Sequence, residues 1–113
     1  MINVLNSLLE TSELSLEELR RTMPEDLEAK LIKLMSLRLV LLNGDVFLIR
    51  PGEKLLVREL IWCAEHNLSA LDLDSRMRKR YHSPPTLEET QKMLLTLNPN
   101  APRVMVSTDS TGV

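Results

Sequence analysis

The side chains best suited to chemistry in this sequence are cations, and they fall into two groups. Residues 29–50 contain a single acid, Asp45, and four bases: Lys30, Lys33, Arg38 and Arg50. Residues 76–80 contain no acid and four bases: Arg76, Arg78, Lys79 and Arg80. Lysine and arginine neutralise phosphates, and each phosphate contact adds about one unit to the salt dependence of binding to a nucleic acid. Both groups are therefore candidate phosphate contacts.

The remaining charge does not favour such contacts. The first 28 residues carry seven carboxylates and two bases, and the whole chain has a formal net charge of −2. A negative charge is not typical of proteins that hold nucleic acid by overall electrostatics. The group at 76–80 also has a structural explanation, because Asp72 and Asp74 precede it, and early acids with late bases suit a helix dipole. Both interpretations of this group stay open.

No arrangement of residues indicates catalysis. His66 and His82 are the only histidines and Cys63 is the only cysteine, so no set of zinc ligands is present. The three glycines are too scattered for a loop that cradles phosphate. Cys63 lies in an apolar segment, where we expect a buried and unreactive thiol. We therefore expect neither an enzyme nor a bound metal or other cofactor.

Two short apolar runs predict a β-hairpin. Residues 39–42 and 46–49 are rich in leucine, valine and isoleucine, and they flank Asn43, Gly44 and Asp45. Asparagine and glycine tolerate the positive φ angles of tight hairpin turns, so this pair is a strong hairpin signal. We predict two strands closed by a turn at these three residues.

Helices are predicted on both sides of the hairpin. Leu27, Leu31 and Leu34 recur at helical spacing after Pro24. Capping signals mark three further helix starts: Ser15 with Glu18, Ser69, and Thr86 with Glu89. The expected helices span about 3–11, 15–22, 24–37, 52–66, 69–81 and 86–97. The sequence thus predicts a mainly α fold with a small β-hairpin.

The order of these segments, over residues 3–66, resembles the winged-helix (winged helix-turn-helix) superfamily, and in particular small bacterial or mobile-element DNA-binding regulators. Residues 24–40 resemble the second helix of the motif and its exit into the wing. Residues 48–53, with the sequence LIRPGE, resemble the segment that leaves the wing and enters a long helix. We accordingly expect a winged helix-turn-helix followed by C-terminal helices. The winged-helix domain would span 1–68, and a helical extension at 69–97 would serve for dimerisation or as a basic clamp. Residues 98–113 would form a flexible tail.

The resemblance implies an interface with double-stranded DNA. The helix at 24–37 would approach the major groove, with Lys30 and Lys33 as its contacts. Three further candidates would reach flanking backbone or the minor groove: Arg38, Asn43 and Arg50. The remaining four would hold phosphates: Arg76, Arg78, Lys79 and Arg80.

Two features of the same helix depart from the family pattern. Arg38 stands where the family usually has a glycine leaving the recognition helix. The front of the helix carries Glu25, Asp26 and Glu28, which phosphates repel. A helix dipole also explains acids at this position, because each carboxylate near its positive end stabilises the helix by ~0.3–1 kcal/mol.

The predicted helix at 52–66 carries a wider apolar band than one packed face requires, which implies a second partner. That partner is either the same helix of another copy of the chain or the chain's own C-terminal region, and the sequence leaves both open. The residues expected at a dimer interface are Val57, Ile61, Trp62, Ala64, Leu68, Leu94 and Leu97.

Two functions follow from these observations. The first is a dimeric DNA-binding protein, such as a transcriptional regulator or a plasmid or phage accessory factor. The alternative is a protein–protein interaction module that uses the acidic helix front and the apolar fourth helix. The alternative accounts better for the net negative charge, and it accounts less well for the group at 76–80.

Composition sets further bounds. There is no apolar run of about 18 residues and no secretion leader, so we expect a cytoplasmic protein without a membrane partner. Aromatic residues make up only 3% of the chain, which argues against a platform for stacking single-stranded bases. Residues 104–106 are apolar enough to add an edge strand to the expected tail.

Overall fold

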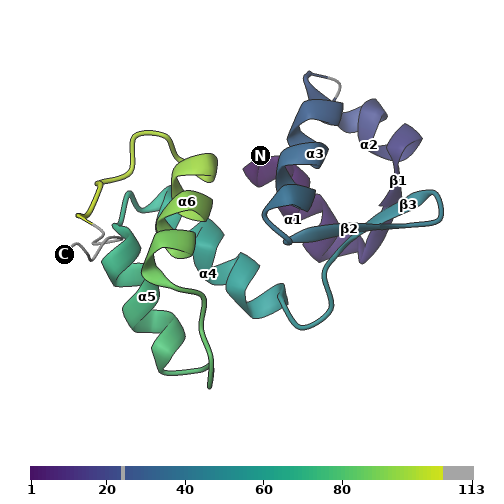
Figure 1. Cartoon of the computed structure of the whole chain (residues 1–113). Coiled ribbons are helices and arrows are strands. Elements are labelled where there is room, and N and C mark those ends of the chain that lie inside the picture. The colour runs from purple at the N-terminus through teal and green to yellow at the C-terminus, as the bar shows by residue number, and fades with distance from the viewer. Residues whose placement is uncertain (24, 106–113) are drawn as a thin grey trace. The chain divides into compact units, whose positions relative to one another are not determined.

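The computed structural model describes residues 1–23 and 25–105 of the chain (Figure 1). This part is mainly α-helical, with six helices and a small antiparallel sheet of three strands. The elements are α1 (Ile2–Thr11), β1 (Glu13–Ser15), α2 (Leu16–Thr22), α3 (Leu27–Ser36), β2 (Val40–Asn43), β3 (Val46–Ile49), α4 (Lys54–Glu65), α5 (Ala70–Arg78) and α6 (Leu87–Leu97).

The chain divides into two compact units, Met1–Val57 and Arg58–Val113. The division falls inside α4, whereas the sequence placed it after residue 68. The reason is that α4 continues without a break across the division, so no turn or linker in the sequence marks it.

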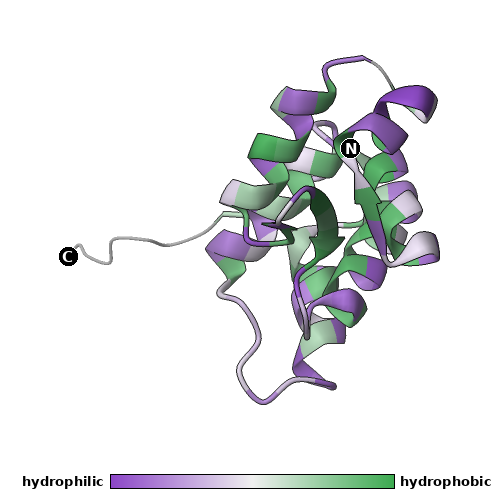
Figure 2. Ribbon diagram, turned by 90° about the vertical axis from the view of Figure 1, so that its right-hand side faces the viewer, coloured by the Kyte–Doolittle hydropathy of each residue, from purple (hydrophilic) through white to green (hydrophobic). Residues whose placement is uncertain are grey.

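In the first unit, three helices and the sheet share an apolar core. The strands are coloured largely as hydrophobic in Figure 2, and their inward side chains join those of the helices. The buried residues of these elements are Val4, Leu5, Leu8, Leu19, Leu27, Leu31, Leu34, Val40, Phe47 and Ile49.

Strand β3 lies in the middle of the sheet, in the order β1-β3-β2. Phe47 is paired with Leu42 of β2 on one side and with Leu14 of β1 on the other. The expected hairpin is present, but β1, between the first two expected helices, was not predicted. A strand of three residues is too short to show the alternation by which strands are recognised in a sequence.

The hairpin turn is one residue shorter than expected. Asn43 is paired with Val46, so only Gly44 and Asp45 lie between the strands. Gly44 has a φ of 67°, and Asp45 is not in the left-handed region. A glycine with positive φ at the first of two turn residues is the pattern of a type II′ turn, which suits the right-handed twist of the strands.

The capping signals in the sequence are confirmed. Ser15 and Thr86 form capping boxes with Glu18 and Glu89, and Ser69 forms a third with Asp72. The start of α3 was placed too early, because the helix begins at Leu27 with Asp26 as its N-cap; Pro24 lies outside the described residues. The fifth helix ends at Arg78, before the expected Tyr81.

Helix α3 ends in a Schellman motif, in which two backbone bonds close the last turn around a left-handed residue. The Leu39 N–H donates to the Leu34 carbonyl at 3.1 Å, and the Arg38 N–H donates to the Met35 carbonyl at 3.0 Å. Arg38 has a φ of 62°, in the region where glycine is favoured. The chain therefore makes this left-handed turn with an arginine, at a position where glycine carries no steric penalty.

In the second unit, the latter part of α4 packs with α5 and α6 around a core of small and flexible apolar side chains. Helix α4 ends in a similar left-handed turn at Asn67, whose φ is 55°. The Asn98 amide, just after α6, donates to the Ala64 carbonyl and to the Asn67 side chain, at 3.1 Å each. The first of these bonds gives a side-chain donor to a backbone carbonyl in the last turn of α4.

The segment after α6 contacts the helix over part of its described length, and the flexibility expected of residues 98–113 stays a prediction. Ala101 is buried, and the Gln91 side chain bonds both backbone groups of Val104. Among the described residues of this segment there is no strand. The edge strand expected at 104–106 is thus absent up to residue 105, and residues 106–113 lie outside the described residues.

We predict that Arg38→Gly raises the free energy of unfolding by about 1 kcal/mol, because glycine adopts the left-handed conformation without a steric penalty. Arg38→Ala is the matched control, since it removes the same charge and keeps the β-carbon. Urea unfolding monitored by circular dichroism measures both variants. Equal stability of the glycine and alanine variants would show that residue 38 is not strained.

Candidate nucleic-acid interface

The exposed face of α3 has an apolar central line. Its solvent-exposed residues are Glu28, Ala29, Ile32, Lys33 and Ser36. At about 3.6 residues per turn, Ala29, Ile32 and Ser36 follow one another along the middle of this face, and Glu28 and Lys33 flank it on opposite sides. Ile32 keeps 63% of its surface exposed. The outermost side chains of α3 are therefore small or apolar, with one cation beside them.

Three cations gather where α3 ends and the hairpin begins. Lys33 lies in the last turn of α3, and Arg38 follows in the left-handed turn. The Arg50 N–H donates to the Leu39 carbonyl at 2.9 Å, which places Arg50 beside the residue after Arg38. All three side chains are exposed, and none forms an ion pair with the described residues. We call Lys33, Arg38 and Arg50 the hairpin-base cations.

Two other predicted contacts of the first unit lie elsewhere. Lys30 is half-buried, and its charge adds to the effect of burial in lowering the pKa of the Met1 amino group. Asn43 is exposed at the tip of the hairpin. The tip is about 10 Å from the hairpin base, given a rise of about 3.3 Å per strand residue. Neither residue belongs to the hairpin-base group.

One of the three acids at the front of α3 is neutralised within the unit. Glu28 forms an ion pair with Arg20 of α2, and the hydrogen bond from Arg20 holds the pKa of this carboxyl below its usual value. Glu25 and Asp26 are exposed and form no ion pair with the described residues. The acids without an ion pair thus lie just before α3, at its N-cap and the residue preceding it, away from the hairpin-base cations.

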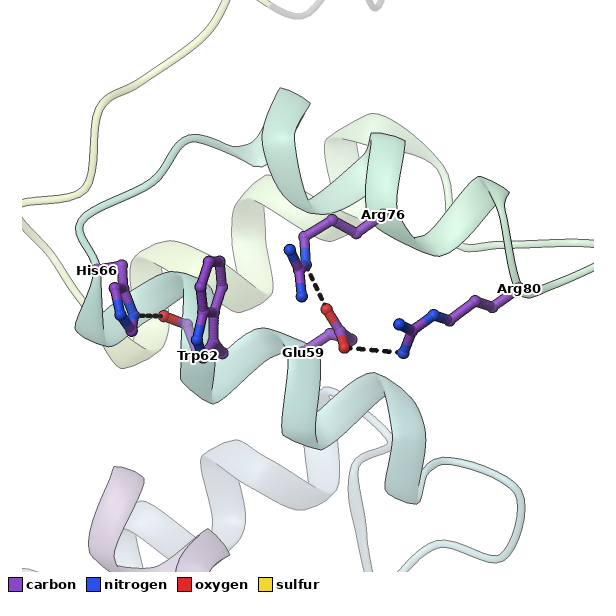
Figure 3. Close-up of polar contacts among 5 residues, drawn as sticks. All are labelled: Glu59, Trp62, His66, Arg76 and Arg80. Atoms are coloured by element: carbon purple, nitrogen blue, oxygen red, sulfur yellow. Dashed lines mark hydrogen bonds and ion pairs between the residues drawn. The ribbon is translucent and has the colours of Figure 1, made fainter.

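In the second unit, the basic group at 76–80 is largely engaged by the chain's own acids. Glu59 of α4, only 8% exposed, accepts from Arg76 and, at 3.0 Å, from Arg80 (Figure 3). Arg78 donates to Asp74 at 2.7 Å, one turn earlier on α5. Lys79 is exposed and forms no ion pair with the described residues. Three of the four predicted phosphate contacts therefore already have a carboxylate partner.

Arg76 is also held by an aromatic stack. Its guanidinium lies 4.2 Å from the centre of the Trp62 ring, and the other face of Trp62 stacks on His66, with centroids 4.2 Å apart (Figure 3). The His66 Nδ1 lies 2.8 Å from the Trp62 carbonyl oxygen. The bond to Glu59 raises the pKa of the Arg76 guanidinium. Arg76 is consequently the most constrained cation of its group.

The sequence did not reveal Glu59 as the partner of these arginines. Glu59 lies 17 residues before Arg76 and 21 before Arg80, and only the packing of α4 with α5 brings them together. The i to i+4 spacing of Asp74 and Arg78 is a signal that a sequence does contain. Arg58, exposed on α4 without an ion pair to the described residues, was also not singled out.

Most residues expected at a dimer interface are buried within the single chain. Val57, Ile61, Ala64, Leu94 and Leu97 are each at most 8% exposed. A second copy could not contact these five side chains without a rearrangement. Leu68 is half-buried and Trp62 is 40% exposed, so these two remain accessible.

The described part of the chain contains no group of three or more histidine, cysteine or acidic residues that could hold a metal ion. None of its helices combines the length and the apolar character that crossing a membrane requires.

Comparisons of the chain with protein-family models, with curated proteins and with solved structures found no match.

We predict that Cys63 is unreactive in the folded chain. The residue is buried, and desolvation raises the pKa of its thiol to about 11. Against an unperturbed value near 8.5, this reduces the thiolate fraction at pH 8 by at least about a hundredfold. As the pH rises, the Cys63 thiol loses its proton in the unfolded state before it does in the folded state. The free energy of unfolding should therefore fall progressively between about pH 8.5 and 11.

Iodoacetamide alkylation at pH 8, in buffer and in concentrated urea, measures the accessible thiolate. Alkylation in buffer should be slower by at least two orders of magnitude. Similar rates in the two conditions would contradict the burial of Cys63.

Proposed function

We propose that this chain is a winged-helix DNA-binding protein in which the end of α3 and the base of the hairpin contact a duplex. The order α1-β1-α2-α3-β2-β3, with a tight hairpin after the third helix, supports this proposal. The observation that carries it is the group of hairpin-base cations, because three exposed charges that form no ion pair with the described residues remain available to phosphates.

The charge along α3 favours an approach by its C-terminal end. Glu25 and Asp26 would meet repulsion from the backbone, whereas Lys33 and Arg38 would be attracted to it. This differs from a docking mode in which the first helical residues read the bases. In the proposal, the first turn of α3 points out of the groove and the hairpin follows the backbone.

The group at 76–80 has a secondary role in this proposal. Lys79 and Arg58 are available for phosphate contact, but Arg76, Arg78 and Arg80 must first exchange a carboxylate for a phosphate. Such an exchange contributes less binding free energy than an unpaired cation would, because one ion pair is lost for each one gained. We further propose a cytoplasmic regulator or accessory factor that acts as a dimer through accessible surface such as Trp62.

One observation favours the alternative of a protein-interaction module. Ile32 is 63% exposed and Leu42 is 49% exposed, and the exposed acids Glu25 and Asp26 immediately precede the helix that carries Ile32. An apolar surface beside acids fits a basic, amphipathic partner segment. On this alternative the hairpin-base cations have no role.

A duplex titration separates the two functions. We predict measurable binding to duplex at low salt, and a salt slope that falls by about two when Lys33→Ala and Arg50→Ala are combined. Lys54→Ala combined with Lys92→Ala is the control, since it removes two exposed cations that belong to neither basic group. Fluorescence anisotropy at several salt concentrations gives the slope. Absence of binding at low salt, or equal slopes for the two double variants, would refute this interface.

A second variant tests whether Glu59 holds its arginines back from phosphate. Glu59→Gln keeps the side-chain shape and frees Arg76 and Arg80, so duplex affinity should rise and the salt slope should steepen by up to about two. Glu65→Gln is the matched control, an exposed carboxylate on the same helix without an ion pair to the described residues. An affinity gain no larger than that of Glu65→Gln would exclude this group from the interface. Circular dichroism checks that both variants are folded.

A further inference from the structure

The exposed line of α3 presents little that could hydrogen-bond to a base. Ala29 and Ile32 have no polar side-chain atom, and the Ser36 hydroxyl donates to the Lys33 carbonyl at 2.7 Å. The side chains that form paired hydrogen bonds to guanine or adenine are arginine, lysine, asparagine and glutamine. Lys33 alone of these types lies on the exposed face of α3.

The major groove offers one apolar group that such a line can recognise. Thymine carries a methyl group on C5, whereas guanine, cytosine and adenine carry no methyl group and are recognised there by their hydrogen-bonding atoms. An exposed isoleucine set against those atoms would desolvate them without replacing their hydrogen bonds, which is unfavourable. Set against a thymine methyl, it would bury apolar surface on both sides.

The positions of the cations determine which part of the exposed line of α3 reaches the base edges. Lys33 adjoins Ile32 in the chain and flanks it on α3, and Arg38 and Arg50 lie just beyond the end of the same helix. Phosphates bound by these three cations would draw the C-terminal half of α3 to the groove, and Ile32 has the largest exposed apolar side chain there. Glu28, on the other flank, is held by Arg20 and so does not turn toward the bases.

We infer that Ile32, with Ala29 beside it, contacts the C5 methyl groups of thymine, so that the duplex recognised by this chain carries thymine at the position facing the middle of α3. This inference rests on the proposed DNA-binding function and adds the class of base that is read.

Replacing thymine by uracil tests the inference at the level of one methyl group. Duplexes enriched from a random-sequence pool by the wild-type protein are amplified with either dTTP or dUTP, which leaves the sequence and phosphates unchanged. The wild type should bind the uracil form about fourfold more weakly for each contacted methyl, from the transfer free energy of one such group. Ile32→Ala should lose most of this discrimination.

Leu71→Ala is the matched control, because Leu71 is a similarly exposed apolar residue, 53% exposed, on α5 of the second unit. It should discriminate as the wild type does. Equal binding of thymine and uracil duplexes by the wild type, discrimination that survives in Ile32→Ala, or failure to enrich any sequence would overturn the inference while duplex binding itself stands. Absence of binding to any duplex at low salt would overturn both the inference and the proposed function.

Discussion

The pairing of β3 with strands on both sides is the constraint that organises the first unit. Val46 is paired with Ser15, and Ser15 is also the N-cap of α2, so the sheet fixes where α2 begins. At the other end of β3, the Arg50 N–H donates to the carbonyl of Leu39, three residues after the end of α3 at Ser36. Because the backbone of β3 is bonded at both ends in this way, α3 has little freedom relative to the hairpin. The backbone positions of the three exposed cations at their junction therefore keep a fixed spacing.

The second unit distributes its charge differently. Its arginines are mostly satisfied by Glu59 and Asp74, which removes much of the positive field suggested by residues 76–80. Burying Glu59 is tolerable because two guanidinium groups donate hydrogen bonds to its carboxylate and neutralise its charge, and that of Arg76 also lies over the Trp62 ring. The cations most available to a polyanion partner are consequently those at the hairpin base, which are fewer but form no ion pair with the described residues.

The sequence predicted those features that depend on neighbouring residues. Capping boxes at Ser15 and Thr86, the hairpin after Arg38 and the burial of Cys63 are local patterns, and the structure confirms them. It could not reveal β1, which exists only because β3 pairs with it, or the ion pairs of Glu59, whose partners are distant in the chain. The same limit applies to the apolar band of α4: the pattern indicated a second packing surface, and only the fold shows that Ala64 and Leu94 are covered within one chain.

We propose that the end of α3 and the base of the hairpin form the surface that meets DNA. An amide NMR titration of the uniformly labelled chain with a short duplex at low salt locates that surface. We expect shifts concentrated at residues 32–38 and at Arg50, with exposed positions of α1 such as Asn3 and Glu10 unchanged. Shifts confined to α1, or to the second unit alone, would contradict it.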